Sequence, residues 1–271
     1  MPPSSSIPPV DAEHPSSARI YDYFLGGAHN FEVDRAAAED ARRVHPAIGL
    51  GMRANRYFLQ RAVRYLAGIG IDQFLDLGSG IPTVGNVHEI AQQGNPEAKI
   101  VYVDIEPIAV AHSRNILAGN GLATVVQADL RRPGEVLGDL DVAALLDLTR
   151  PIAVIMAGVL QYIDDSSDPS AVIAGYRDRV APGSYFALQH PSKDGLTEAR
   201  ETGASAASAV YDRTATPFTY RGKARFESFF AGLEPVEPGI VEMWRWRPDP
   251  AEPRVDIAGK ASGFAGVGRK P

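Results

Sequence analysis

The feature that most constrains the fold is an alternation of short apolar runs with amphipathic stretches, which begins after Gly70. This alternation is typical of a parallel sheet with crossover helices. The expected strands are residues 73–77, 100–104, 124–128, 152–157 and 185–189, with two more around 240–244 and 261–267. No internal repeat and no second core interrupts the pattern, so residues 71–271 are expected to form one α/β domain.

The first quarter of the chain has a different character. Residues 1–16 are rich in Pro and Ser and lack periodicity, so we expect a disordered tail. Residues 33–44 and 52–68 carry helical patterns, and the latter ends at two nearby glycines. Residues 17–70 are therefore predicted to form a helical extension, which is also a candidate lid.

Composition excludes several classes of protein. A net charge of −6, with no run of Lys or Arg longer than two, lacks the electrostatic signature of a nucleic-acid binder. The chain has no cysteine, which removes disulfides and thiolate metal sites, and no histidines lie at metal-ligand spacing. Without an apolar run of membrane length or a signal sequence, we expect a cytoplasmic protein that does not bind membranes. Its oligomeric state is not predicted.

The most informative segment is FLDLGSGIPT, residues 74–83, in which a strand runs into a glycine turn and then a helix. Gly78 and Gly80 permit a tight turn and close approach of a ligand to the backbone. A dinucleotide fingerprint would have a third glycine at Thr83, and Asp76 would repel a pyrophosphate. A carboxylate in this place suits a ligand with cationic groups, such as the ammonium and sulfonium of S-adenosylmethionine.

Two more acids end the next two predicted strands. Asp104 follows the glycine turn at about the 20-residue spacing expected of a ribose-binding acid. Asp129 ends the third strand, where a carboxylate can accept a hydrogen bond from an adenine amino group. All three acids are expected to face one crevice outside the carboxyl ends of the strands.

The segments FLDLGSGIPT, VYVDIEP and VVQADLRRP resemble motifs of class I S-adenosylmethionine-dependent methyltransferases. More narrowly, RIYDYFLGGAHNF, RANRYFLQRAVRYLA, NVHEIAQ and GFAGVGRKP resemble an actinobacterial S-adenosyl methyltransferase family long filed as a domain of unknown function. The resemblance covers residues 17–271. It implies a Rossmann-like sheet of seven mostly parallel strands in the order 3-2-1-4-5-7-6, with S-adenosylmethionine as cofactor.

The resemblance also implies which residues contact the cofactor. They are Asp76, Gly78, Gly80, Asp104 with the adjacent Ile105, and Asp129 with Leu130. Two N-terminal candidates join them. Arg53 carries a charge suited to the methionine carboxylate, and Tyr23 belongs to an aromatic segment around Gly26 and Gly27 that can close over a site.

The leading hypothesis is a methyltransferase acting on an oxygen or nitrogen of a small organic acceptor. His190 ends the fifth predicted strand, at the rim where an acceptor enters, and is the candidate general base. Tyr162 is a second catalytic candidate, and Tyr162 and Gln161 are expected to line the acceptor pocket. One alternative is a non-catalytic S-adenosylmethionine-binding sensor or partner protein. Another is an NAD-dependent oxidoreductase, which Asp76 and Thr83 disfavour. The acceptor itself is not predicted.

Overall fold

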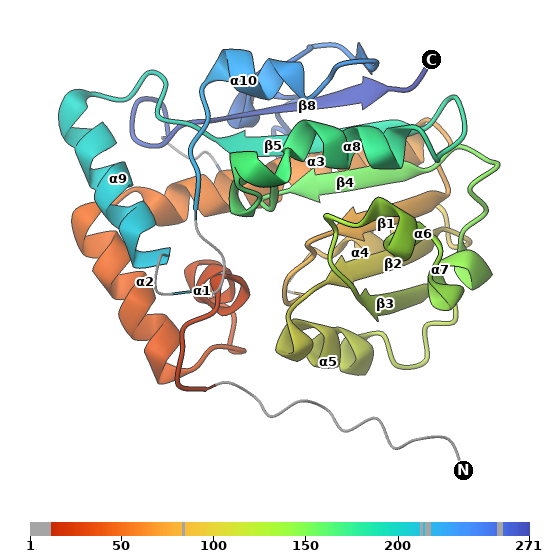
Figure 1. Cartoon of the computed structure of the whole chain (residues 1–271), viewed down its shortest axis with the longest axis horizontal. Coiled ribbons are helices and arrows are strands. Elements are labelled where there is room, and N and C mark those ends of the chain that lie inside the picture. The colour runs from red at the N-terminus through yellow and green to blue at the C-terminus, as the bar shows by residue number, and fades with distance from the viewer. Residues whose placement is uncertain (1–11, 83–84, 212–213, 215–217, 254–256) are drawn as a thin grey trace.

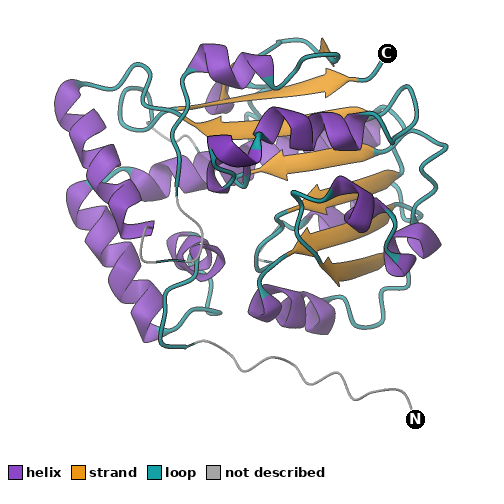
Figure 2. Cartoon of the chain, viewed as in Figure 1, coloured by secondary structure: helices purple, strands orange, loops and turns teal. Residues whose placement is uncertain are grey.

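A mostly parallel sheet forms the centre of the molecule (Figures 1 and 2). The computed structural model describes residues 12–82, 85–211, 214, 218–253 and 257–271. Its strands are β1 Gln73–Leu77, β2 Lys99–Asp104, β3 Ala123–Gln127, β4 Ala153–Ala157, β5 Tyr185–Pro191, β6 Glu234–Pro235, β7 Val241–Glu242 and β8 Gly263–Arg269.

The strand order confirms the predicted topology. It runs β3-β2-β1-β4-β5-β8-β6, with β8 antiparallel to β5 and with the short β7 also paired to β8. The first five strands match the predicted ranges to within two residues at each end. The strand expected over 240–244 is shorter, because Met243–Arg245 turn into a 3-10 helix, η3.

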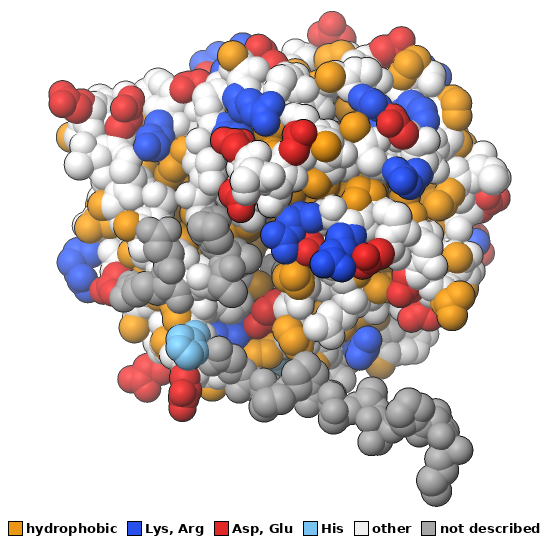
Figure 3. Space-filling model, viewed as in Figure 1, with side chains coloured by type: hydrophobic (Ala, Val, Ile, Leu, Met, Phe, Trp, Pro, Cys, Tyr) orange, Lys and Arg blue, Asp and Glu red, His pale blue; other side chains and the backbone are white. Residues whose placement is uncertain are grey.

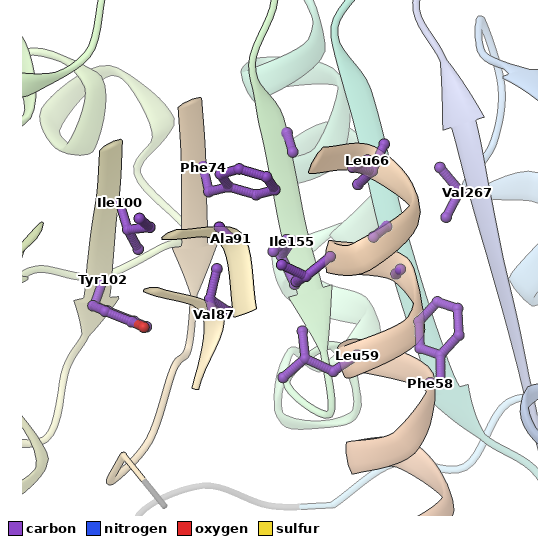
Figure 4. Close-up of a cluster of buried hydrophobic side chains, with 14 of the residues drawn as sticks. Phe58, Leu59, Leu66, Phe74, Val87, Ala91, Ile100, Tyr102, Ile155 and Val267 are labelled. Atoms are coloured by element: carbon purple, nitrogen blue, oxygen red, sulfur yellow. The ribbon is translucent and has the colours of Figure 1, made fainter. Parts of the chain in front are cut away.

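Helices cover both faces of the sheet. Helices α3 (Ile48–Gly68), α4 (Val87–Gly94) and α5 (Pro107–Ile116) contribute to the apolar core on one face. Helices α6 (Pro133–Leu137), α7 (Leu140–Leu145), α8 (Pro169–Arg177) and α10 (Lys223–Ser228) cover the other. Figure 4 shows Leu59 and Leu66 of α3 beside the strands that carry Phe74 and Ile155, and Phe58 on the side of α3 toward Val267 of β8. Helix α3 is therefore part of the sheet's own core.

A third layer stands beyond the carboxyl ends of the parallel strands, which point toward it in Figure 1. It consists of α1 (Ser17–Phe24), α2 (Glu32–Val44) and α9 (Glu198–Tyr211). Its own core contains Ile20, Phe24, Ala37, Ala38 and Tyr211. Residues 1–11 of the expected tail lie outside the described residues. This layer places α1 over the strand ends, where a ligand is expected to bind.

The surface in Figure 3 carries Lys and Arg interspersed with Asp and Glu, without a continuous basic area on that face. Among the described residues, none of the helices combines the length and apolar character needed to cross a bilayer.

Candidate functional site

A cavity of about 490 Å³ lies at the carboxyl ends of β1, β2 and β3. Its walls come from the glycine turn, the ends of β2 and β3, the loop after β4 and the N-terminal segment, defined here as residues 14–21. The structure brings most of the predicted site residues to it: Asp76, Gly78, Gly80, Asp104, Ile105, Asp129, Leu130 and Tyr162. The crevice expected from the three strand-end acids is thus present.

The turn after β1 requires glycine for two separate reasons. Gly78 and Gly80 have φ values of 69° and 63°, a region that side chains with a Cβ rarely adopt. A Cβ at Gly78 would also overlap the side chain of Val159. The Gly78 and Ser79 amides donate to the Val103 carbonyl at 2.8 and 3.1 Å, which fixes the turn against β2. The backbone of this turn therefore borders the cavity without a side chain at Gly78 or Gly80 to cover it.

Asp104 joins β2 to this turn. Its Oδ2 accepts a hydrogen bond from the Gly80 amide at 2.6 Å, and its Oδ1 accepts one from the Glu106 amide at 2.9 Å. Burial nevertheless raises the pKa of the carboxyl group above its ordinary value. Each carboxylate oxygen accepts more than one hydrogen bond, so Asp104 retains capacity for hydroxyl donors of a ligand.

Asp76 is the most perturbed acid of the cavity. Its pKa is raised to about 7: burial is the largest cause, Arg56 opposes it, and the nearby Asp104 adds to it. Ser79 Oγ, which belongs to a residue lining the same cavity, is buried without a hydrogen-bond partner among the described residues. A buried carboxyl group and an unpartnered hydroxyl in one cavity favour a ligand that brings a cationic N–H donor.

The end of β3 carries the third acid. Both Asp129 oxygens accept hydrogen bonds from the Arg131 side chain, at 2.7 to 3.0 Å, and these bonds hold the Asp129 pKa below its usual value. The Leu130 carbonyl accepts from the Tyr176 hydroxyl at 2.9 Å. Ile105 also lines the cavity. It is 52% exposed and presents an apolar side chain on which a flat ring can lie.

Two of the predicted cofactor contacts do not line the large cavity. Arg53 is exposed on α3 and does not line the cavity, whereas Arg56, almost one helical turn further on, does. Tyr23 donates to Glu39 Oε1 at 2.6 Å, away from the cavity, and Tyr21 lines it instead. The Tyr23 correction follows from helical geometry, since two residues separated by two positions on a helix face nearly opposite sides. Arg53 and Arg56 are three positions apart and share a side of α3, so they differ mainly in their position along the helix.

The geometry of His190 contradicts a general-base role. The side chain is 1% exposed and packs against the rings of Phe226 and Phe229, on the α10 side of the sheet. Its Nε2 accepts from Arg221 at 2.9 Å, which leaves Nδ1 to donate to the Pro191 carbonyl at 2.7 Å. Burial lowers the His190 pKa to about 3. With both ring nitrogens engaged, His190 positions Arg221.

Arg221 in turn fixes the loop that borders the cavity. Its guanidinium donates to the carbonyl groups of Leu160 and Ile163, at 3.0 and 2.6 Å, and to Asp165. This loop contains Tyr162, in the 3-10 helix η1 (Leu160–Tyr162), and is followed by η2 (Asp165–Ser167). Burial raises the pKa of Tyr162, so its hydroxyl stays protonated.

A second cavity, of about 80 Å³, lies beside the first. Tyr21, Gly158 and Tyr162 line both cavities and therefore mark the junction between them. The rest of the small cavity is formed by α3, α9, the end of β5 and the segment around Tyr220. Tyr162 and Gln161, which the sequence placed at an acceptor pocket, both line this cavity. The rest of its walls come from segments far apart in the chain, which no local sequence pattern connects.

Arg19, which the sequence analysis did not single out, ties the N-terminal segment over the large cavity. Its side chain is 1% exposed and pairs with Asp34 at 2.6 Å and with Glu106 at 2.9 Å. It also donates to the His14 carbonyl at 2.6 Å. Since Glu106 caps α5 through the Ala109 amide, Arg19 connects α1 and α2 to the strand end that carries Asp104.

Comparison with known proteins gives consistent matches. Residues 4–271 match the family model described as S-adenosyl methyltransferase. A DUF574 family protein from Streptomyces avermitilis is 37% identical, with a TM-score of 0.91 over 96% of this chain and 99% of that one. A protein from Thermobifida fusca described as a putative methyltransferase is 40% identical, with a TM-score of 0.87 over 98% and 99%. No curated protein matches.

Proposed function

The chain belongs to the S-adenosyl methyltransferase family, and from this premise we propose that its large cavity holds S-adenosylmethionine and its small cavity a small organic acceptor. The observation that carries the proposal is the convergence of three strand-end acids and a glycine turn on one cavity. When bound, the cofactor supplies a methyl group on a sulfonium sulfur, which is transferred in line to an oxygen or nitrogen.

The residues of the large cavity fit the cofactor part by part. Asp76 would hold the ammonium group, and Asp104 the ribose hydroxyls. Asp129 and the Leu130 backbone would hold the adenine, with Ile105 against the face of its ring. The glycine turn fits as well, since Gly78 and Gly80 line the same cavity and let a ligand approach the backbone there.

The junction residues would align the acceptor. Tyr21 and Tyr162 both have pKa values raised by burial, so they donate and accept hydrogen bonds as neutral hydroxyls and do not remove a proton. Transfer from a sulfonium needs mainly alignment of nucleophile, carbon and sulfur. Tyr21 belongs to the N-terminal segment, so we propose that residues 17–70 include a lid that excludes water from this alignment.

Asp76 gives the proposed cofactor site a pH dependence. The charged and titratable groups that act on it are Arg56 of α3 and Asp104 of β2, and Asp76 in turn acts on Tyr21 and Tyr102. In the protein without ligand, the Asp76 carboxyl group is protonated when the pH is below its pKa of about 7. A bound ammonium group favours the carboxylate instead. Binding therefore releases a proton below that pH and none above it.

We accordingly expect the affinity for S-adenosylhomocysteine to fall as the pH is lowered from 8 to 6, by at most about tenfold per unit below pH 7. Calorimetric titration in buffers of different ionisation enthalpy measures both the affinity and the released proton. Asp76→Asn should bind more weakly at pH 8 and lose this dependence. Equal affinity of the wild type across the range would remove Asp76 from the ammonium site.

Methyl transfer itself is tested by incubating the protein with S-adenosylmethionine labelled in the methyl group and fractionated cell extracts. The proposal predicts label in a low-molecular-mass product. Label in macromolecules alone would contradict a small acceptor. Intact cofactor binding without label in any fraction would favour the non-catalytic alternative.

A further inference from the structure

The small cavity contains buried hydrogen-bond acceptors that no described residue uses. Asn55 Oδ1, Gln161 Oε1 and Gln189 Oε1 have no hydrogen-bond partner in the part of the chain that the structure describes. All three side chains line this cavity, and each is at most 6% exposed. Unpaired buried polar groups are rare and costly, so their concentration in one cavity points to a ligand.

The orientation of two of these amides follows from their neighbours. Gln161 Nε2 donates to the Gly158 carbonyl at 2.7 Å, and a carbonyl only accepts, so Oε1 is the free atom. The Tyr21 hydroxyl donates to the Met52 carbonyl at 3.3 Å and accepts from Asn55 Nδ2 at 3.0 Å. Asn55 therefore also leaves its oxygen free.

Both free oxygens lie near the junction of the two cavities. Gly158 lines both of them, Gln161 bonds to its carbonyl, and a Cβ at Gly158 would lie 2.7 Å from Asn55 Nδ2. A ligand that satisfies these oxygens is thereby held beside the large cavity. Gln189, whose Nε2 contacts only the Met243 sulfur at 3.6 Å, presents a third amide further along the wall.

The remaining wall is apolar and aromatic. Tyr162, Tyr211, Phe218 and Tyr220 form a chain of ring contacts, with centroids 4.9 to 6.1 Å apart. None of the lining residues that the structure describes is an Asp, Glu, Lys or Arg. His45 lines the cavity, but burial and the nearby Arg200 lower its pKa. Such a wall leaves a ligand charge without compensation and suits a flat ring.

We propose that the methyl acceptor is a flat, uncharged aromatic molecule with at least two O–H or N–H donors, held by the amide oxygens of Asn55, Gln161 and Gln189. This inference rests on the proposed function. In the transfer, a lone pair of an acceptor oxygen or nitrogen forms the bond to the methyl carbon, and the electron pair of the broken carbon–sulfur bond returns to sulfur. The displaced proton leaves to water, so the acceptor's own acidity determines how readily it reacts.

The test uses ligand-detected NMR on the full chain saturated with S-adenosylhomocysteine. The probes are 1,2-dihydroxybenzene and 1,2-diaminobenzene, which carry donors, 1,2-dimethoxybenzene, which carries none, and the charged benzoate and benzylamine. We expect the two donor-bearing rings to bind at least about tenfold more tightly than the dimethoxy ring, as two lost hydrogen bonds imply. The charged rings should bind no more tightly than the dimethoxy ring.

Variants locate the binding. Gln189→Leu and Gln189→Met should weaken the donor-bearing probes roughly two- to tenfold and leave 1,2-dimethoxybenzene unchanged. Ser208→Ala is the matched control, because this cavity residue already donates to the Ser205 carbonyl of its own helix. Thermal unfolding of each variant verifies that it is folded.

The inference is overturned if the dimethoxy or charged rings bind as tightly as the donor-bearing ones, if no donor-bearing ring binds, or if both Gln189 variants bind them like the wild type. In all of these outcomes S-adenosylhomocysteine still binds and the proposed function stands. Failure of S-adenosylhomocysteine to bind in the same samples would instead contradict the proposed function, and the acceptor inference with it.

Discussion

Replacement of Arg19 by alanine is expected to lower the free energy of unfolding by roughly 3–5 kcal/mol, the usual cost of removing one partner of a buried ion pair. Asp34 is fully buried and would lose its cationic partner, and Glu106 would lose its connection to α1. Because Glu106 is hydrogen-bonded through its amide to Asp104, the variant should also weaken cofactor binding. Urea unfolding and calorimetric titration with S-adenosylhomocysteine measure the two effects.

Arg42→Ala is the matched control, since Arg42 pairs with Glu39 on the exposed side of α2. An exposed pair of this kind contributes at most about 1 kcal/mol. If Arg19→Ala and Arg42→Ala are equally stable, the ion pairs of Arg19 do not hold the N-terminal layer in place. If Arg19→Ala is destabilised but binds the cofactor with unchanged affinity, the lid interpretation of the N-terminal segment is wrong.

Gly78→Ala should have the largest effect on the cofactor cavity. The substitution places a Cβ on a residue with φ of 69° and drives it into Val159. The backbone alone costs roughly 1–2 kcal/mol, and the overlap must displace either the glycine turn or the loop after β4. The glycine turn and this loop both border the cavity. We therefore expect no cofactor binding by Gly78→Ala in a titration under conditions where binding by the wild type is readily measured.

The clash and the backbone strain can be separated. Val159→Gly in the Gly78→Ala background removes the Val159 Cβ and both methyl groups that the new Cβ would meet, so it should recover part of the affinity. Gly121→Ala should behave as the wild type, because a Cβ there meets nothing within 4 Å. Unimpaired cofactor binding by Gly78→Ala, or no recovery in the double variant, would contradict the role given to this turn.

The sheet and the cofactor side of the site were predictable because their signals are local. Each parallel strand is a short apolar run, and each acid follows its strand directly, so Asp76, Asp104 and Asp129 meet wherever β1, β2 and β3 lie side by side. Helix α9 lacked such a signal. Its buried residues are mostly small, Gly203, Ala204 and Ala207, and their pattern differs little from that of a polar loop.

Beyond Tyr162 and Gln161, the proposed acceptor cavity was not predictable, because it depends on which way single side chains point. Neighbouring residues on a strand face opposite sides of the sheet, so His190 points toward α10 while Gln189 reaches the small cavity. The titratable residue of this pair is His190, so choosing the residue by its chemistry alone leads to the face of the sheet opposite the small cavity. The polar atoms that remain free in the small cavity become apparent only once every neighbour is placed.

Calorimetric titration of the wild type and of Asp104→Ala with S-adenosylhomocysteine at pH 8, with NAD as the competing candidate, tests the central claim most directly. We predict one S-adenosylhomocysteine bound per chain, no binding of NAD, and a loss of roughly 10- to 150-fold in affinity for Asp104→Ala, the range for hydrogen bonds to a charged group. Unchanged affinity in a folded Asp104→Ala, or binding of NAD in preference to S-adenosylhomocysteine, would contradict the account.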